Sequence, residues 1–325
     1  MTKRNSFYSP AIFEQVNKEN KAILQDYVLE LKSKRKSDGT IYQYSADIKM
    51  FYCWAFNELD NKSILRMKKR DFRRFFLELQ ENGASSARIN RVQCSLRNLL
   101  EFCTEDEDEY DYDINSMKSI KGLQKEEVRE IHFLTDEQIT IIIDYLLAKK
   151  QYQKALYVSL SYDSAGRRNE VFQVLKEGFA EGKRTNMVQG KRGKKFQLMY
   201  LSRTREIARL YFEQRGNDDI ESLWIVGKGE DRRAAKYETL YNWTVSFRKI
   251  LEKETGELIE MNPHSFRHSA LENYENGTHH SLAEMGKDKL DIQVLKVLAN
   301  HTSIDTTQSY LKNKDQELLD EAFGI

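Results

Sequence analysis

The sequence has few cysteines, no long apolar run and almost no net charge, and each shortage excludes a class of protein. Its cysteines, Cys53, Cys94 and Cys103, are an odd number without metal-ligand spacing, which suits a reducing cytoplasm. No stretch approaches the roughly 18 apolar residues that a membrane span needs. The basic start MTKRNSFYSP is not followed by an apolar segment, so we expect no signal peptide.

A net charge of +1 on 325 residues gives no overall attraction to nucleic acid, but the charges are unevenly distributed. Residues 1–100 hold 19 lysines and arginines against 11 acidic residues, a balance of +8. Residues 101–130 hold 4 against 11, mostly within EDEDEYDYD at 105–113. This asymmetry fits a basic nucleic-acid-binding module followed by an acidic segment, and it equally fits solvated helix faces beside an acidic loop.

Apolar residues recur every three or four positions through the first hundred residues, which predicts four short amphipathic helices. The apolar stripes lie at residues 23–31, 44–59, 72–79 and 89–103. Because the loops between them are short, we expect a compact helical bundle over residues 15–104. Residues 105–130 lose the stripe and gain charge, which predicts a linker.

The pattern of apolar and polar residues over 131–325 predicts a second domain that is mainly helical with one small sheet. It opens at FLTDEQI, where Thr135 and Gln138 have the spacing of a capping box. The stretch NMVQGKRGKKFQLMYLS alternates around a Gly-Lys-rich turn, which predicts a β-hairpin. Helical patterns surround it near 135–149, 151–163, 168–177, 203–214, 236–254, 264–274, 290–299 and 304–322.

Candidate anion-binding residues lie at the starts of two predicted helices. In NPHSFRHS, Asn262 can cap a helix whose first turn holds His264, and Arg267 shares its face three residues on. In SAGRRNEV, Arg167 precedes a helix whose free N–H groups also favour an anion. A guanidinium can hold two phosphate oxygens at once, although ordinary surface residues or an Arg–Glu pair would produce the same local patterns.

Three further residues complete a set with one chemistry. His301 and Tyr310 stand nine residues apart in NHTSIDTTQSY, and Lys191 lies in GKRGKK at the predicted hairpin tip. Together with two arginines and His264, they suit attack of a phenolic oxygen on a phosphodiester. The arginines would neutralise the non-bridging oxygens, while histidine and lysine would move protons. We assign no site to His268 or to the adjacent His279 and His280.

These motifs, in this order, resemble the tyrosine recombinase (phage integrase) family. SAGRRNEV is similar to the family's TGxRxxEL-like stretch and Gly190–Lys191 to its hairpin glycine and lysine. HSFRHS is similar to HxLRHT, and NHTSIDTTQSY to GHxxxxTTxxY. The catalytic residues that the resemblance implies are Arg167, Lys191, His264, Arg267, His301 and Tyr310. Two positions depart from the family pattern, since Ala165 and Asn300 stand where it usually keeps glycine, and the connection between the third and fourth motifs is longer than usual.

The resemblance, over roughly residues 15–315, implies a mainly α, two-domain clamp on duplex DNA. A SAM-like core-binding bundle (15–104) and a linker (105–130) would precede a mixed α catalytic-type domain with a small β-sheet (131–325). We expect DNA contacts from Lys34, Arg35, Lys36, Arg88 and Arg91. The tail KDQELLDEAFGI is an amphipathic helix that would join protomers into a homo-oligomer on DNA, or pack in cis.

Two functions follow from the resemblance. The first is site-specific DNA cleavage and rejoining through a 3′-phosphotyrosine, as in integration or excision of a phage or mobile element. The second is a catalytically inactive DNA-binding protein of the same fold that acts as a phage transcriptional repressor controlling lysogeny. A metal-dependent nuclease or phosphatase is disfavoured, and we expect no metal and no cofactor. The expected location is the cytoplasm, on the nucleoid, without membrane contact.

Overall fold

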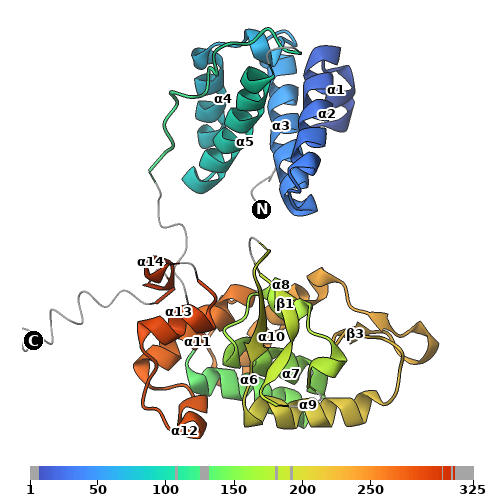
Figure 1. The fold of residues 1–325 in the computed structure, drawn as a ribbon, viewed down its shortest axis with the longest axis vertical. Coiled ribbons are helices and arrows are strands. Elements are labelled where there is room, and N and C mark those ends of the chain that lie inside the picture. The colour runs from blue at the N-terminus through green and yellow to red at the C-terminus, as the bar shows by residue number, and fades with distance from the viewer. Residues whose placement is uncertain are drawn as a thin grey trace, which may run out of the picture. The chain divides into compact units, whose positions relative to one another are not determined.

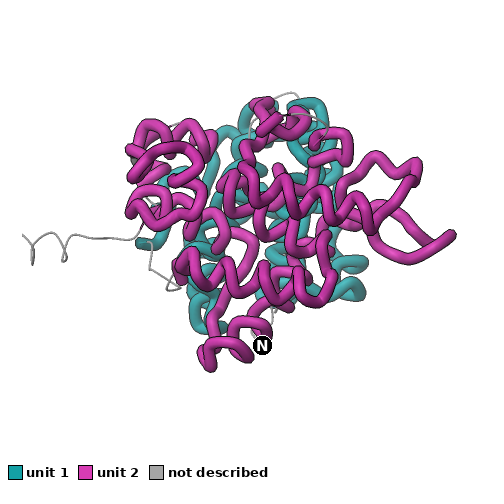
Figure 2. The backbone as a smooth tube through the Cα atoms, turned by 90° about the horizontal axis from the view of Figure 1, so that it is seen from below, with its two compact units in different colours: residues 1–130 teal, residues 131–325 magenta. Residues whose placement is uncertain are grey.

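The computed structural model describes residues 7–106, 109–124, 132–179, 182–190, 193–301, 303–308 and 310–311 of the chain. By its contacts the chain divides into two compact units, residues 1–130 and 131–325 (Figure 1, Figure 2). Helices dominate both units, and the sheets within the described ranges are two short antiparallel pairs of strands. The mainly helical fold class predicted from the sequence is therefore confirmed. No helix in these ranges is long and apolar enough to cross a membrane.

The first unit is a bundle of helices around an aromatic core. Its helices are α1 (Pro10–Gln15), α2 (Lys18–Ser33), α3 (Asp38–Glu58), α4 (Lys69–Glu81) and α5 (Ser86–Glu105). The helices α2 to α5 correspond to the four apolar stripes of the sequence, whereas α1 was not predicted. On α4 the stripe buries Phe72, Phe75, Phe76 and Leu79, while most of its charged residues stay at the surface.

Residues 109–124, which we expected within a linker, pack along α5 instead. Tyr110, Tyr112, Met117 and Ile120 are buried in the core of the first unit. The hydroxyl of Tyr110 also donates to Asp26 at 2.7 Å. The acidic composition concealed this role, because the four apolar side chains follow no helical or strand period. The clamp arrangement concerns the relative placement of the two units and stays a prediction.

The second unit surrounds one helix that is buried over most of its length. Its helices are α6 (Asp136–Ala148), α7 (Tyr152–Asp163), α8 (Arg168–Phe172), α9 (Ser202–Arg215), α10 (Tyr237–Thr255), α11 (Pro263–Asn276), α12 (Ser281–Met285), α13 (Ile292–Leu298) and α14 (Ile304–Gln308). Helix α7 packs against α6, α9 and α11, and every residue from Ala155 to Asp163 is buried. Its buried hydroxyls are paired, for example Ser159 with Thr204 at 2.6 Å. Because α7 is enclosed, it holds the loop that follows it in a fixed position.

The predicted hairpin is present as β1 (Arg184–Gln189) and β2 (Lys195–Met199), which pair antiparallel with Gln189 opposite Lys195. A second pair, β3 (Ile225–Val226) and β4 (Arg233–Ala234), was not predicted. The side-chain amide of Gln173, just after α8, donates to the carbonyl oxygen of Gln189 and accepts from its N–H, both at 2.9 Å. These two bonds fasten the end of β1 to α8.

Candidate active site

Arg167 is fixed by the buried end of α7 and by the start of α8. It is the residue that caps α8, and its backbone N–H donates to the carboxylate of Glu170 at 2.7 Å. The same carboxylate accepts from Nη1 of the Arg167 side chain at 3.0 Å. Glu170 is buried, whereas the Arg167 side chain keeps 22% of its surface exposed. The guanidinium is therefore oriented by the protein and still open to a ligand.

Arg267 lies one turn into α11 and is 1% exposed. Its Nη1 donates to the carbonyl of Ala165 at 2.6 Å, and its Nη2 donates to that of Ala299 at 2.5 Å. The predicted cap of this helix is confirmed, since Asn262 accepts from the N–H of His264 with Pro263 at the first position. Burial first, and then the charge of Arg167, lowers the pKa of Arg267 to about 10. The charge of Arg167 is therefore close enough to Arg267 to influence its pKa.

The two departures from the family's glycines occur at left-handed backbone positions. Ala165 has φ +48° and Asn300 has φ +51°, where glycine is least strained. Asparagine tolerates this region, while alanine costs roughly 1–2 kcal/mol there. The Ala165 carbonyl nevertheless bonds to Arg267, as does the carbonyl of Ala299 just before Asn300. The substitutions have therefore not displaced the carbonyls that hold the buried arginine.

His301 is bonded through both ring nitrogens. Because arginine only donates, Nε2 of His301 accepts from Nη2 of Arg267, at 2.6 Å. The ring proton then lies on Nδ1, which donates to the Thr307 hydroxyl at 2.9 Å. Burial and the charges of Arg267 and Arg167 lower the pKa of His301 to about 3, so the ring is neutral at neutral pH. In this geometry His301 orients Arg267.

Tyr310 lies in the turn after α14, not two turns into a long helix as predicted. Its ring centroid is 5.0 Å from the guanidinium carbon of Arg267 and 4.9 Å from the ring of His301. His268, to which the sequence analysis assigned no site, stacks on Tyr310 at 4.4 Å and 19°. Its Nδ1 also donates to the Tyr310 carbonyl at 3.1 Å. The sequence does indicate that His268 lies near His264, because it follows His264 by four residues on the same helix face.

The remaining two catalytic candidates are less fully placed. Lys191 lies outside the described residues. The preceding Gly190 packs so closely that an added Cβ would stand 3.1 Å from Glu170 Oε1 and from Asn300 Nδ2, which puts the end of the hairpin beside the carboxylate that holds Arg167. His264 is open to solvent on the first turn of α11. Desolvation by neighbouring protein atoms lowers the pKa of His264, and the charges of His268, Arg267 and Arg167 lower it further.

The five candidate DNA-contact residues of the first unit differ in how far they are engaged internally. Arg91 makes two bonds to Asp47, at 3.1 and 3.2 Å, and Lys34 pairs with Glu30 at 2.7 Å. Arg88 is half-buried, with Nη2 at 3.6 Å from the sulfur of Met50. Arg35 and Lys36 are exposed just beyond α2. None of these contacts bears on DNA binding itself, which stays a prediction.

Two family models match the chain. Residues 132–317 match the one described as Phage integrase family, and residues 24–107 match Phage integrase, N-terminal SAM-like domain. Among curated relatives, the SPbeta prophage-derived recombinase-like protein YomM of Bacillus subtilis (strain 168) is 26% identical over 94% of this chain and 91% of its own. Tyrosine recombinase XerA of Thermococcus onnurineus is 28% identical over 89% and 90%.

Solved structures share the fold at lower identity. A lambda integrase dimer bound to a COC′ core site has a TM-score of 0.65 and 14% identity, over 95% of this chain and 82% of that one. XerH recombinase bound to palindromic difH substrate has a TM-score of 0.66 and 15% identity, over 92% and 83%. The motif order, the buried arginine and the two family matches agree, and the chain belongs to the tyrosine recombinase (phage integrase) family.

Proposed function

We propose that the chain binds specific sites in duplex DNA and cleaves and rejoins one strand through Tyr310, as in integration or excision of a phage or mobile element. The observation that carries the proposal is the stacking of Tyr310 beside the Arg267 guanidinium, 5.0 Å away. This guanidinium would bind the non-bridging oxygens of the phosphate that the Tyr310 oxygen attacks. Such a protein would act on the nucleoid, in the cytoplasm.

The reaction would proceed by exchange of one phosphorus–oxygen bond for another. The Tyr310 oxygen would bond to phosphorus as the bond to the 5′-oxygen breaks, which leaves a 3′-phosphotyrosine. Arg167 and Arg267 would bind the non-bridging oxygens. The lowered pKa of His264 leaves its ring neutral at neutral pH, so it could accept the phenolic proton. We assign protonation of the 5′-oxygen to Lys191. In the rejoining step Lys191 would take this proton back as the 5′-oxygen attacks phosphorus and Tyr310 leaves.

A second candidate is a catalytically inactive member that represses phage transcription and so controls lysogeny. The observation that favours it is the internal bonding of the buried cluster. Arg267 and His301 are held by bonds to Ala165, Ala299 and Thr307 of the chain itself. Their geometry therefore contributes to the fold even where no bond is ever cleaved. Both candidates share specific DNA binding and differ in covalent chemistry.

A nicked suicide substrate separates the two candidates. Binding sites selected from a random duplex pool would be nicked near the centre, so that cleavage releases a short fragment and traps the adduct. We expect a covalent protein–DNA adduct from wild type and none from Tyr310→Phe. Tyr152→Phe is the matched control, because Tyr152 lies at the opposite end of α7 from Arg167. Tight specific binding with no adduct from wild type would refute cleavage and leave the repressor.

We propose that Lys34, Arg35, Lys36, Arg88 and Arg91 contact DNA phosphates. Because Arg91 and Lys34 also hold internal ion pairs, the cleanest tests are Arg35→Ala and Lys36→Ala. Each should flatten the slope of log affinity against log salt by about one unit. Arg209→Ala, at an exposed pair in the second unit, is the control. Slopes equal to wild type in both variants would remove this face from the interface.

We also propose assembly into a homo-oligomer on DNA through the tail, residues 316–325, which lies outside the described residues. Its alternation of Leu318, Leu319 and Phe323 with acidic residues would suit docking on a second copy. Deletion of the tail should weaken cooperative binding to paired sites more than binding to one site. Equal loss at both kinds of site would indicate packing in cis. The domain limits 131–325 likewise stay a proposal, whereas the core of the first unit extends beyond residue 104 to Ile120.

A further inference from the structure

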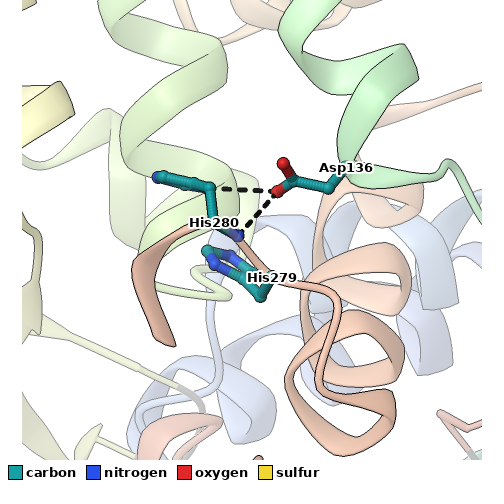
Figure 3. A group of neighbouring side chains, drawn as sticks. All are labelled: Asp136, His279 and His280. Atoms are coloured by element: carbon teal, nitrogen blue, oxygen red, sulfur yellow. Dashed lines mark hydrogen bonds and ion pairs between the residues drawn. The ribbon is translucent and has the colours of Figure 1, made fainter. Parts of the chain in front are cut away.

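A cluster of two histidines and two aspartates lies within the second unit, and no step proposed above uses it. Asp136 is the first residue of α6, and His279 and His280 lie in the connection between α11 and α12 (Figure 3). One ligand atom from each of these three side chains lies within 4.8 Å of the others. The sequence alone does not display this grouping, because Asp136 stands more than a hundred residues before the histidine pair.

Both ring nitrogens of His280 contact carboxylates. Its Nδ1 lies 3.1 Å from Oδ1 of Asp136, and its Nε2 lies 3.2 Å from Oδ1 of Asp163. Metal-bound histidines generally donate their second ring N–H to a carboxylate, which fixes the ring and its tautomer. If Nδ1 of His280 bound a metal beside Asp136, Asp163 would already stand in that outer position.

His279 supplies an imidazole whose bonding is incomplete. It is 2% exposed and lies between the rings of Tyr162, at 4.1 Å, and Tyr274, at 3.7 Å, nearly parallel to both. Its Nδ1 accepts from the Ser281 N–H at a long 3.2 Å. Nothing in the described part of the chain bonds to its buried Nε2. Because Nδ1 accepts, the proton of the neutral ring lies on Nε2. Ligation through Nε2 would therefore move this proton to Nδ1, break the long bond from Ser281 and form a metal–nitrogen bond.

We propose that Asp136, His279 and His280 bind one divalent transition-metal ion of the zinc class. Two imidazoles and a carboxylate suit such an ion better than calcium or magnesium, which prefer oxygen ligands. The side chains of Asp136 and His280 are each 21% exposed, which gives the ion a route from solvent. On binding, the proton shared between His280 and Asp136 leaves to solvent, and a water completes the coordination.

The ion would stabilise the segment between α7 and α8, which holds Arg167, without binding to either active-site arginine. Asp163, the outer partner of His280, also accepts from the hydroxyl of Thr204, at 2.6 Å, and stands two residues before Ala165. Its backbone carbonyl accepts from the Tyr274 hydroxyl at 2.9 Å. A metal at the cluster would thus join the start of α6, the end of α7 and the connection before α12. This role is structural and independent of whether Tyr310 cleaves DNA.

The test is a zinc titration of the full chain, without an affinity tag and after treatment with chelator. In competition with a chromophoric chelator we expect one tightly bound Zn²⁺ per chain and a rise in thermal midpoint. Co²⁺ should give visible absorption bands of a low-coordinate site. Asp136→Asn and His280→Gln should each weaken Zn²⁺ affinity at least tenfold. His132→Gln, an exposed histidine outside the cluster, should leave it unchanged.

Two results would overturn the proposal. The first is absence of stoichiometric Zn²⁺ binding by wild type, which would leave the cluster as a His280 bridge between two carboxylates. The second is equal Zn²⁺ affinity in wild type, Asp136→Asn and His280→Gln, which would place the ion elsewhere. Should His280→Gln fail to fold, Asp136→Asn decides, because it preserves the shape of a partly exposed side chain.

Discussion

Replacing each of the two active-site arginines by lysine should have very different effects on folding. Arg267→Lys removes a planar fork that donates to the Ala165 and Ala299 carbonyls and to Nε2 of His301. A lysine ammonium cannot span all three acceptors. Two of these acceptors would be left buried and unsatisfied, at a cost of about 1–3 kcal/mol each. The free energy of unfolding should therefore fall by about 2–6 kcal/mol. Arg167→Lys keeps a cation beside Glu170 at a partly exposed site, so we expect the free energy of unfolding to fall by about 1 kcal/mol or less.

Urea unfolding of the DNA-free protein measures the difference. A Trp54→Phe background leaves Trp224 and Trp243, both in the second unit, as the fluorescent reporters. Both lysine variants should impair DNA cleavage, so activity does not distinguish them, whereas the unfolding midpoint does. If Arg267→Lys unfolds at the same urea concentration as Arg167→Lys, the carbonyl network does not support the fold and the reasoning fails.

Three further outcomes follow from named contacts. Gly190→Ala should destabilise the second unit by about 1–3 kcal/mol, because its Cβ would meet the Phe196 ring at 2.8 Å. Its control is Gly39→Ala in the open first turn of α3, which should leave the second unit unchanged and alter the first unit by no more than a stabilisation of roughly 0.5 kcal/mol, measured by calorimetry. His301 has a folded pKa of about 3 against 6.5 unfolded, so its contribution is complete above pH 6.5 and declines on acidification. Between pH 6.5 and 5 the loss should be about 2 kcal/mol, and His301→Asn should remove that part of the pH dependence. Arg91→Ala should destabilise the first unit by about 1–3 kcal/mol, since it leaves the buried Asp47 carboxylate without its cation; a thermal midpoint equal to wild type would contradict this.

Local chemistry in the sequence was sufficient for much of the fold. Helices α2 to α5 follow from apolar spacing, and the β1–β2 hairpin follows from alternation around glycine and lysine. The capping box at Thr135 and Gln138 is present in the structure with both of its bonds. These features depend on neighbours within about four residues, which a single sequence displays directly.

Features that depend on distant partners were not accessible in the same way. The acidic run suggested an exposed linker, yet Tyr110 is buried against helices formed much earlier in the chain. Ala165 and Asn300 looked like departures that could disturb the site, and their left-handed conformations became visible only with the backbone. The spacing of His268 from His264 placed both on one helix face, but it could not show that His268 contacts Tyr310, which is 42 residues away.

Because Arg267 binds two backbone carbonyls and His301 at once, selection for a stable fold is by itself enough to retain it. A lineage that stopped cleaving DNA but still occupied its sites would lose stability on changing either residue, so both would persist. Tyr310 is held through its ring and its carbonyl, which a phenylalanine would also provide. In such a lineage the phenolic hydroxyl of Tyr310 would therefore be lost by mutation before Arg267. Persistence of Arg267 and His301 in such a lineage would record the demands of folding rather than those of recombination.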